Sequence, residues 1–143
     1  GPLGNFGLRS TEKSKWVFVA TGTGVAPVIS MLSDTDTNFF ENKVVYIYWG
    51  GRTIENIYLD VPALGFDAAF IPVLSREARQ GFREGYVQDS VVSDIPDLSD
   101  AVVYACGSPE MIDDSRKLFL TRGLKEDCFY ADSFVATNSE ETL

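Results

Sequence analysis

The chain has 143 residues, 45% of them hydrophobic, with a formal net charge of −9 and no histidine. This length and apolar content fit one domain with an ordinary core, and the negative charge argues against nucleic acid or an anionic membrane as a partner. The lack of histidine excludes Ser-His-Asp triads and most zinc sites, and two cysteines are too few for an iron–sulfur cluster.

Location and metal binding follow from the same composition. No apolar run reaches the roughly 20 residues of a membrane span, and no signal peptide is visible. Such sparse use of cysteine suits a reducing compartment. We therefore expect a cytoplasmic protein without a metal site and without a membrane partner.

Strand and helix patterns alternate along the chain. Continuous apolar runs predict strands at 16–21, 43–49, 67–74, 101–106 and 128–131. Helical periodicity predicts helices at 25–33 and 109–122, with shorter helical pieces near 54–59 and 86–93. This alternation predicts an α/β fold: a doubly wound, five-stranded parallel sheet with helices on both faces and strand order 3-2-1-4-5.

The most informative segment runs from Trp16 to Pro27. Here an apolar strand leads directly into Gly22-Thr23-Gly24, and Pro27 falls in the first turn of the helix that follows. Backbone N–H groups at such a turn, together with the positive end of the helix dipole, form a site for a phosphate or pyrophosphate. Glycine leaves that backbone open to the anion. The alternative is that the glycines serve only tight packing of strand against helix.

A second turn of the same kind is Ala105-Cys106-Gly107-Ser108-Pro109, again between a predicted strand and a helix that starts with proline. Both turns follow strands of a parallel sheet, and ligands of such sheets bind at the carboxyl ends of the strands. The two turns together strengthen the prediction of a phosphate-binding site. For Cys106 the alternative is an ordinary buried cysteine, since free cysteines commonly behave as small apolar residues.

Further motifs accompany the two glycine turns. They are Tyr48-Trp49-Gly50-Gly51-Arg52-Thr53, Leu74-Ser75-Arg76-Glu77, Gly85-Tyr86-Val87 and Tyr130-Ala131-Asp132-Ser133-Phe134. In this order they resemble the NAD(P)-binding domain of ferredoxin-reductase-type flavoenzymes, over nearly the whole chain. The similarity is closest to reductases with FAD and a plant-type 2Fe-2S cluster, such as oxygenase reductases, and to CDP-6-deoxy-glucoseen-reductase-like proteins.

The resemblance implies a role for each motif. Gly22, Thr23 and Gly24 would cradle the dinucleotide pyrophosphate, and Cys106 with Gly107 would place the nicotinamide ring beside the flavin. Phe134 would cap the flavin or occupy the nicotinamide pocket; the alternative for Phe134 is a packing residue. Cys106 and Phe134 are thus the candidate catalytic residues. The other cofactor-binding candidates are Arg52, Ser75, Arg76, Tyr86, Ser108 and Pro109.

The resemblance also implies a domain organisation. Residues 1–9 look like the closing segment of a flavin domain, the remnant of a cleaved tag, or both; residues 10–137 would form the NAD(P)-binding domain and 138–143 a mobile tail. FAD and a possible 2Fe-2S cluster would then belong to the intact parent. Its partners would be the flavin domain of the same parent chain and a redox acceptor such as an oxygenase or iron–sulfur protein. The isolated fragment is expected to be inactive.

Two other functions remain open at this point. The first is a nucleotide-binding or regulatory module that keeps the fold but carries out no redox chemistry. The second is a flavodoxin-like domain that binds FMN itself, which leaves the second glycine turn with Cys106 unexplained.

Between NADPH and NADH, the sequence slightly favours NADPH. The second predicted strand ends without the carboxylate that commonly meets the ribose hydroxyls in NAD-preferring folds, and Arg52 follows instead. Ser75-Arg76 resembles the Ser-Arg pair that holds the 2′-phosphate in plant-type NADP reductases, and Arg79 and Arg83 add nearby cations. The alternative is an exposed basic loop that neutralises neighbouring carboxylates.

Arg76→Ala should weaken NADPH binding far more than NADH binding, because each charge-assisted hydrogen bond from a guanidinium to a phosphate contributes about 1.5–3 kcal/mol. Calorimetric titration with each coenzyme measures the difference. If the wild type binds NADH at least as tightly and the variant shows no selective loss, the NADPH preference is wrong.

Overall fold

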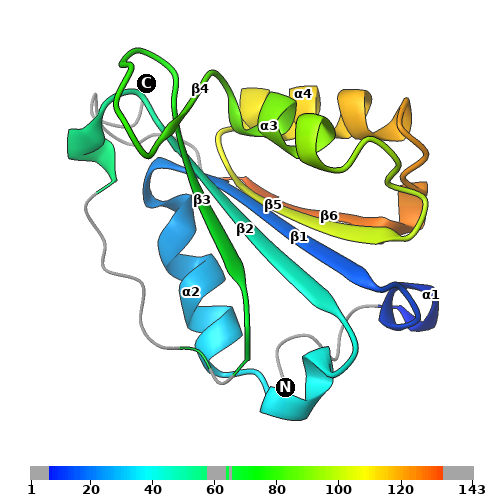
Figure 1. Ribbon diagram of the computed structural model, residues 1–143. Coiled ribbons are helices and arrows are strands. Elements are labelled where there is room, and N and C mark those ends of the chain that lie inside the picture. Colours follow the sequence, from blue (N-terminus) through cyan, green and yellow to red (C-terminus); the bar gives the residue numbers. More distant parts are fainter. Residues whose placement is uncertain (1–6, 58–63, 65, 134–143) are drawn as a thin grey trace.

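The computed structural model describes residues 7–57, 64 and 66–133 (Figure 1). Its strands are β1 (Lys15–Thr21), β2 (Val44–Gly51), β3 (Ala69–Leu74), β4 (Arg83–Glu84), β5 (Ala101–Gly107) and β6 (Phe129–Ser133). They form one parallel, six-stranded sheet in the order β4-β3-β2-β1-β5-β6. The predicted α/β fold and the order of the five longer strands are confirmed, and the short edge strand β4 was not predicted.

Helices connect these strands. The α-helices are α1 (Leu8–Thr11), α2 (Val25–Ser33), α3 (Val87–Asp94) and α4 (Pro109–Leu120), and the short 3₁₀ turns are η2 (Gly22–Gly24), η3 (Thr37–Phe40), η4 (Ile54–Asn56) and η5 (Glu126–Cys128). Figure 1 shows α2 on one face of the sheet and α3 with α4 on the other. The predicted helix at 109–122 ends slightly early, at Leu120, and the piece expected near 54–59 is the 3₁₀ turn η4.

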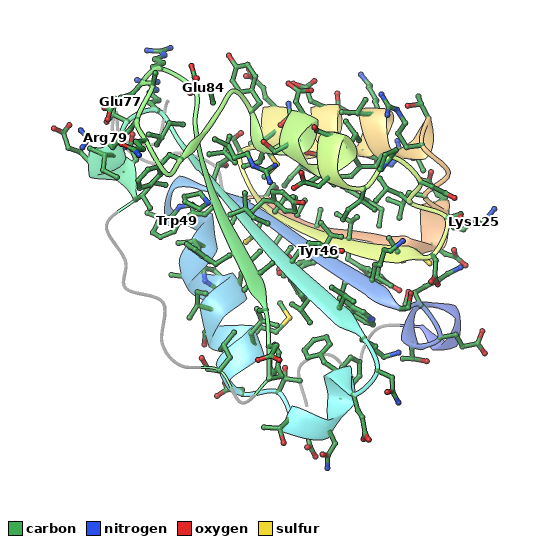
Figure 2. The ribbon with its side chains drawn as sticks, viewed as in Figure 1. Tyr46, Trp49, Glu77, Arg79, Glu84 and Lys125 are labelled. Carbon is green, nitrogen blue, oxygen red and sulfur yellow. The ribbon has the colours of Figure 1, made fainter. Side chains whose placement is uncertain are left out.

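The central strands are buried on both faces, which explains their continuous apolar runs. Trp16 and Phe18 of β1 pack into the core on the α2 side, whereas Val17 and Val19 pack into the core under α3 and α4. Side chains fill both spaces between sheet and helices, with Trp49 in the core on the α2 side (Figure 2). Since successive side chains of a strand point to opposite faces, only an unbroken apolar run satisfies both cores.

The carboxyl ends of the three central strands lie level with one another. In the registers, Thr21 of β1 pairs with Gly50 of β2, and Ala20 pairs with Cys106 of β5. The loops that leave these strands therefore start from the same edge of the sheet. The two glycine turns predicted to bind phosphate are thus brought together.

Gly24 makes the closest approach between these loops. It is buried, and a Cβ atom added to it would lie 2.2 Å from the carbonyl oxygen of Cys106 and 2.8 Å from its carbonyl carbon. The neighbour is backbone and cannot turn aside. Glycine at this position is therefore required for packing of the η2–α2 segment against β5, as the alternative interpretation of the turn proposed.

A polar cluster fastens the short edge strand to helix α3. The Tyr48 hydroxyl donates a 2.7 Å hydrogen bond to Asp94, and the Arg83 guanidinium contacts both oxygens of the same carboxylate at 2.8 Å. Burial, followed by the bond to Asp94, raises the pKa of Tyr48 well above its ordinary value. The ion pair of Arg83 with Asp94 thus links β4 to α3.

Gly24→Ala is expected to lower the free energy of unfolding by about 2 kcal/mol or more, because the new methyl group overlaps backbone atoms of β5. Urea unfolding followed by circular dichroism measures the loss. Ser30→Ala, on the exposed face of α2, is the control and should change stability by less than about 0.5 kcal/mol. A Gly24→Ala protein as stable as this control would show that the contact has room to relax.

Candidate functional site

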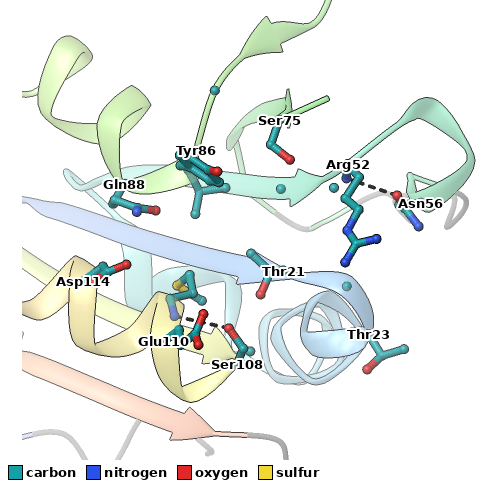
Figure 3. A pocket seen from close by; sticks show the side chains of 17 residues that line it. Thr21, Thr23, Arg52, Asn56, Ser75, Tyr86, Gln88, Ser108, Glu110 and Asp114 are labelled. Carbon is teal, nitrogen blue, oxygen red and sulfur yellow. Dashed lines mark hydrogen bonds between the residues drawn. The ribbon is translucent and has the colours of Figure 1, made fainter. Parts of the chain in front are cut away.

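A cavity of about 540 Å³ lies at the carboxyl edge of the sheet (Figure 3). Its walls come from the ends of β1, β2 and β5 and from the starts of η2, α3 and α4. The lining residues include Gly22, Thr23, Arg52, Asn56, Tyr86 and Ser108. This is the edge at which open α/β sheets bind their ligands.

The first glycine turn contributes two of its three residues to the cavity. Gly22 and Thr23 line the wall, but Gly24 does not, because it lies buried against β5. Gly22 has φ +56°, and an added Cβ would meet nothing within 4 Å. Its side of the turn is therefore open, while its backbone conformation is one that side-chain-bearing residues rarely adopt.

The second turn is held by a helix cap. The Ser108 hydroxyl accepts a 3.2 Å hydrogen bond from the Met111 backbone N–H, and Pro109 occupies the first position of α4. Gly107 and Ser108 line the cavity, whereas Pro109 is not among the lining residues. A Cβ on Gly107 would lie 2.2 Å from the Thr21 Oγ1, so this glycine lets β1 and β5 end side by side.

The arginines predicted near the 2′-phosphate are separated by the fold. Arg52 and Ser75 line the cavity, whereas Arg76 is exposed and is not among the lining residues. Arg79 forms an ion pair with Glu77, in the loop at the upper left of Figure 2, and Arg83 pairs with Asp94. Arg79 and Arg83 therefore neutralise neighbouring carboxylates, as the alternative interpretation of this loop expected.

Tyr86 presents an exposed aromatic ring beside the cavity. It precedes α3 as the N-cap residue, lines the cavity and is 62% exposed. Gln88 in the first turn of the same helix also lines the wall. A large aromatic side chain left in solvent beside a cavity offers a face on which a planar ring can stack.

Cys106 lies beneath the cavity edge rather than on its wall. It is fully buried in the core on the α2 side, with Phe18 and Tyr104. Burial raises the pKa of its thiol to about 11, and the negative charge of Asp132, its register partner on β6, acts in the same direction. The Tyr104 hydroxyl donates to the Asp132 carboxylate. The thiol is therefore protonated at neutral pH. Phe134 lies outside the described residues.

Several lining residues had no site role assigned from the sequence, although Gly50, Gly51, Gly85 and Val87 belong to the quoted motifs. These lining residues are Thr21, Gly50, Gly51, Asn56, Gly85, Val87, Gln88, Glu110, Met111 and Asp114. Glu110 and Asp114 could have been predicted from the sequence, because residues four positions apart lie on one face of a helix and α4 begins at the cavity. No sequence pattern indicated Asn56, since its place in the cavity wall depends on how the short 3₁₀ turn η4 folds back on β2.

Within the described ranges, no group of His, Cys, Asp and Glu side chains is arranged to hold a metal ion. Among the helices of those ranges, none has both the length and the apolar character needed to span a bilayer.

A parallel α/β sheet whose carboxyl edge carries a cavity between two glycine turns, each followed by a helix, defines a nucleotide-binding α/β domain. Residues 18–117 match the oxidoreductase NAD-binding domain family, and the chain belongs to that family. This confirms the resemblance inferred from the motifs.

Known relatives are longer than this chain. Protein RfbI of Salmonella typhimurium is 37% identical over 146 residues, which cover 99% of this chain and 44% of the relative. CDP-6-deoxy-L-threo-D-glycero-4-hexulose-3-dehydrase reductase of Yersinia pestis is 39% identical over 140 residues, covering 94% and 42%. The chain therefore spans less than half the length of these two relatives.

A solved structure shows the same fold. The Amycolatopsis cytochrome P450 reductase GcoB superposes with a TM-score of 0.73 at 27% identity, over 96% of this chain and 44% of that one.

The raised pKa of Cys106 predicts a loss of stability in alkali. Between pH 9, the ordinary thiol value, and about pH 11, the native state keeps a proton that the unfolded chain has lost. Because the native state then binds more protons, the free energy of unfolding falls as pH rises. Cys106→Ser cannot ionise, so urea unfolding across this range should give a shallower decline than in the wild type. Equal slopes would contradict the assignment.

Proposed function

We propose that this domain binds a nicotinamide dinucleotide in the cavity and serves as the NAD(P)H-binding part of a flavin-dependent electron-transfer reductase. The observation that carries the proposal is the convergence of two glycine turns and Arg52 on one cavity. The family match and the reductase names of the relatives support it.

The cavity suits the parts of a dinucleotide. Backbone N–H groups of Gly22 and Thr23, in the η2 turn that leads into α2, would bind the pyrophosphate, assisted by the Arg52 guanidinium. The exposed ring of Tyr86 would stack on a base. Ser108 would offer a hydroxyl at the start of α4.

The reacting end is assigned to the edge near Cys106. A bound reduced nicotinamide supplies a hydride, and the protein's task is to hold that ring against an acceptor. Gly107 lines the cavity directly after Cys106, so a ring bound at this edge would lie next to the end of β5. We also propose that Phe134 caps the flavin or occupies the nicotinamide pocket.

The whole parent would carry more than this domain. We assign FAD to a part of the parent outside this sequence, and electrons would pass from it to an oxygenase, an iron–sulfur protein or a comparable acceptor. The relatives are named as a dehydrase reductase and a cytochrome P450 reductase, which supports an acceptor of this kind. We also propose that the parent holds a 2Fe-2S cluster and lies in the cytoplasm.

The preference for NADPH also remains a prediction. Arg52 in the cavity favours the 2′-phosphate that distinguishes NADPH from NADH. Arg79 and Arg83 give this preference less support, because they pair with Glu77 and Asp94.

Titration calorimetry with NADH and with NADPH tests the binding proposal, and saturable binding is expected. Tyr86→Ala should weaken binding about 5- to 100-fold, the usual range for loss of one base–aromatic stack. Val44→Ala is the control, because Val44 is also a large apolar side chain exposed to solvent and lies at the amino end of β2, far from the cavity edge. Its affinity should equal that of the wild type.

The isolated domain should reduce ferricyanide only at background rate, because the proposal assigns the hydride acceptor to another domain. Robust NADH- or NADPH-dependent turnover by the pure chain without added flavin would contradict this division of labour. The absence of dinucleotide binding would contradict the proposed function altogether.

A further inference from the structure

Arg52 has a special place in the charge balance of the cavity. It is the one basic residue among the described residues that line it, and Glu110 and Asp114 line the same cavity. The chain as a whole carries a formal charge of −9. Arg52 is therefore the side chain of the described cavity wall that can offer a positive charge to an anionic ligand.

The Asn56 side chain holds the backbone at Arg52. Its Oδ1 atom accepts hydrogen bonds from two successive backbone N–H groups, those of Arg52 and Thr53, both at 3.1 Å. Figure 3 shows the Arg52 side chain leaving this turn toward the part of the cavity that holds Thr21. One amide oxygen thus fixes the two peptide planes that flank the Arg52 Cα.

The same turn is fastened on its other side. The carbonyl oxygen of Arg52 accepts a 2.9 Å bond from the Arg76 N–H, and that of Gly51 accepts a 2.9 Å bond from the Ser75 N–H. A Cβ on Gly51 would lie 2.8 Å from the Asn56 Cβ, so glycine lets the asparagine fold back against β2. Both backbone polar groups of Arg52 are therefore held.

We propose that Asn56 is a positioning residue, which holds Arg52 so that its guanidinium meets a phosphate of the bound dinucleotide. This inference rests on the proposed function. Asn56 would act by keeping the backbone from which the Arg52 side chain projects in its binding conformation before the ligand arrives, because affinity rises when a loop need not be ordered on binding. The competing explanation is that Asn56 only stabilises the turn η4.

A double-mutant cycle separates the two explanations. The wild type, Asn56→Ala, Arg52→Ala and the double variant are titrated with NADH and with NADPH. Arg52→Ala should weaken binding about 10- to 100-fold, as for loss of charge-assisted hydrogen bonds. Asn56→Ala should weaken binding about three- to tenfold, as for loss of preorganisation in a binding loop. In the Arg52→Ala background, Asn56→Ala should change affinity less than about twofold.

Two variants supply the controls. Asp36→Ala removes a comparable side-chain cap, since Asp36 Oδ1 accepts a 3.0 Å bond from Asn38 N–H at η3, which leads into the amino end of β2. It should lower the melting temperature as Asn56→Ala does, but leave both affinities unchanged. Asn56→Asp keeps the accepting oxygen, so it should recover affinity relative to Asn56→Ala. Any remaining deficit should shrink with added salt, which screens the new charge.

The outcomes distinguish the two claims. If Asn56→Ala weakens binding equally with and without Arg52, or if Asp36→Ala weakens it as much, the positioning role is overturned while the proposed function stands. If Asn56→Asp at high salt is no better than Asn56→Ala, the role is likewise overturned. If the folded wild type binds neither coenzyme, the proposed function fails and this inference fails with it.

Discussion

The approach of Gly24 to the backbone of Cys106 is the contact on which the cavity depends. The turn after β1 lies against the end of β5 with no space for even a methyl group between them, since an added Cβ would sit 2.2 Å from the Cys106 carbonyl oxygen. The helices that follow these strands, α2 and α4, pack on opposite faces of the sheet. Because both helices follow strands that end at the same edge of the sheet, their amino ends lie together there, although the helices cover different faces.

The glycine turn has a packing role and a proposed ligand-binding role, and the two fall on different residues. Gly22 faces the cavity with open space beyond it, whereas Gly24 faces the protein interior. A substitution at Gly24 disturbs packing before it disturbs any ligand. The phosphate-binding role proposed for this turn therefore belongs to Gly22 and Thr23.

Electrostatics add a second constraint on the site. An acidic protein that binds an anionic ligand needs its few cations placed accurately, because their number cannot compensate for poor positions. Most of the basic loop that follows β3 is engaged elsewhere, with Arg79 on Glu77 and Arg83 on Asp94. The Asn56 amide oxygen holds the backbone at Arg52, the basic residue of the described cavity wall.

The sequence by itself determined the fold and the edge of the sheet at which the site lies. Buried parallel strands demand unbroken apolar runs, and glycine turns before helices that begin near proline are local patterns, so β1, β5, α2 and α4 were all recognisable. Only the tertiary structure decided which side chains share the cavity. Arg52 and Arg76 were both cofactor-binding candidates from the sequence, yet of the two only Arg52 lines the cavity. The short strand β4 and the contribution of Asn56 also depend on contacts between distant segments, which leave no periodic trace along the chain.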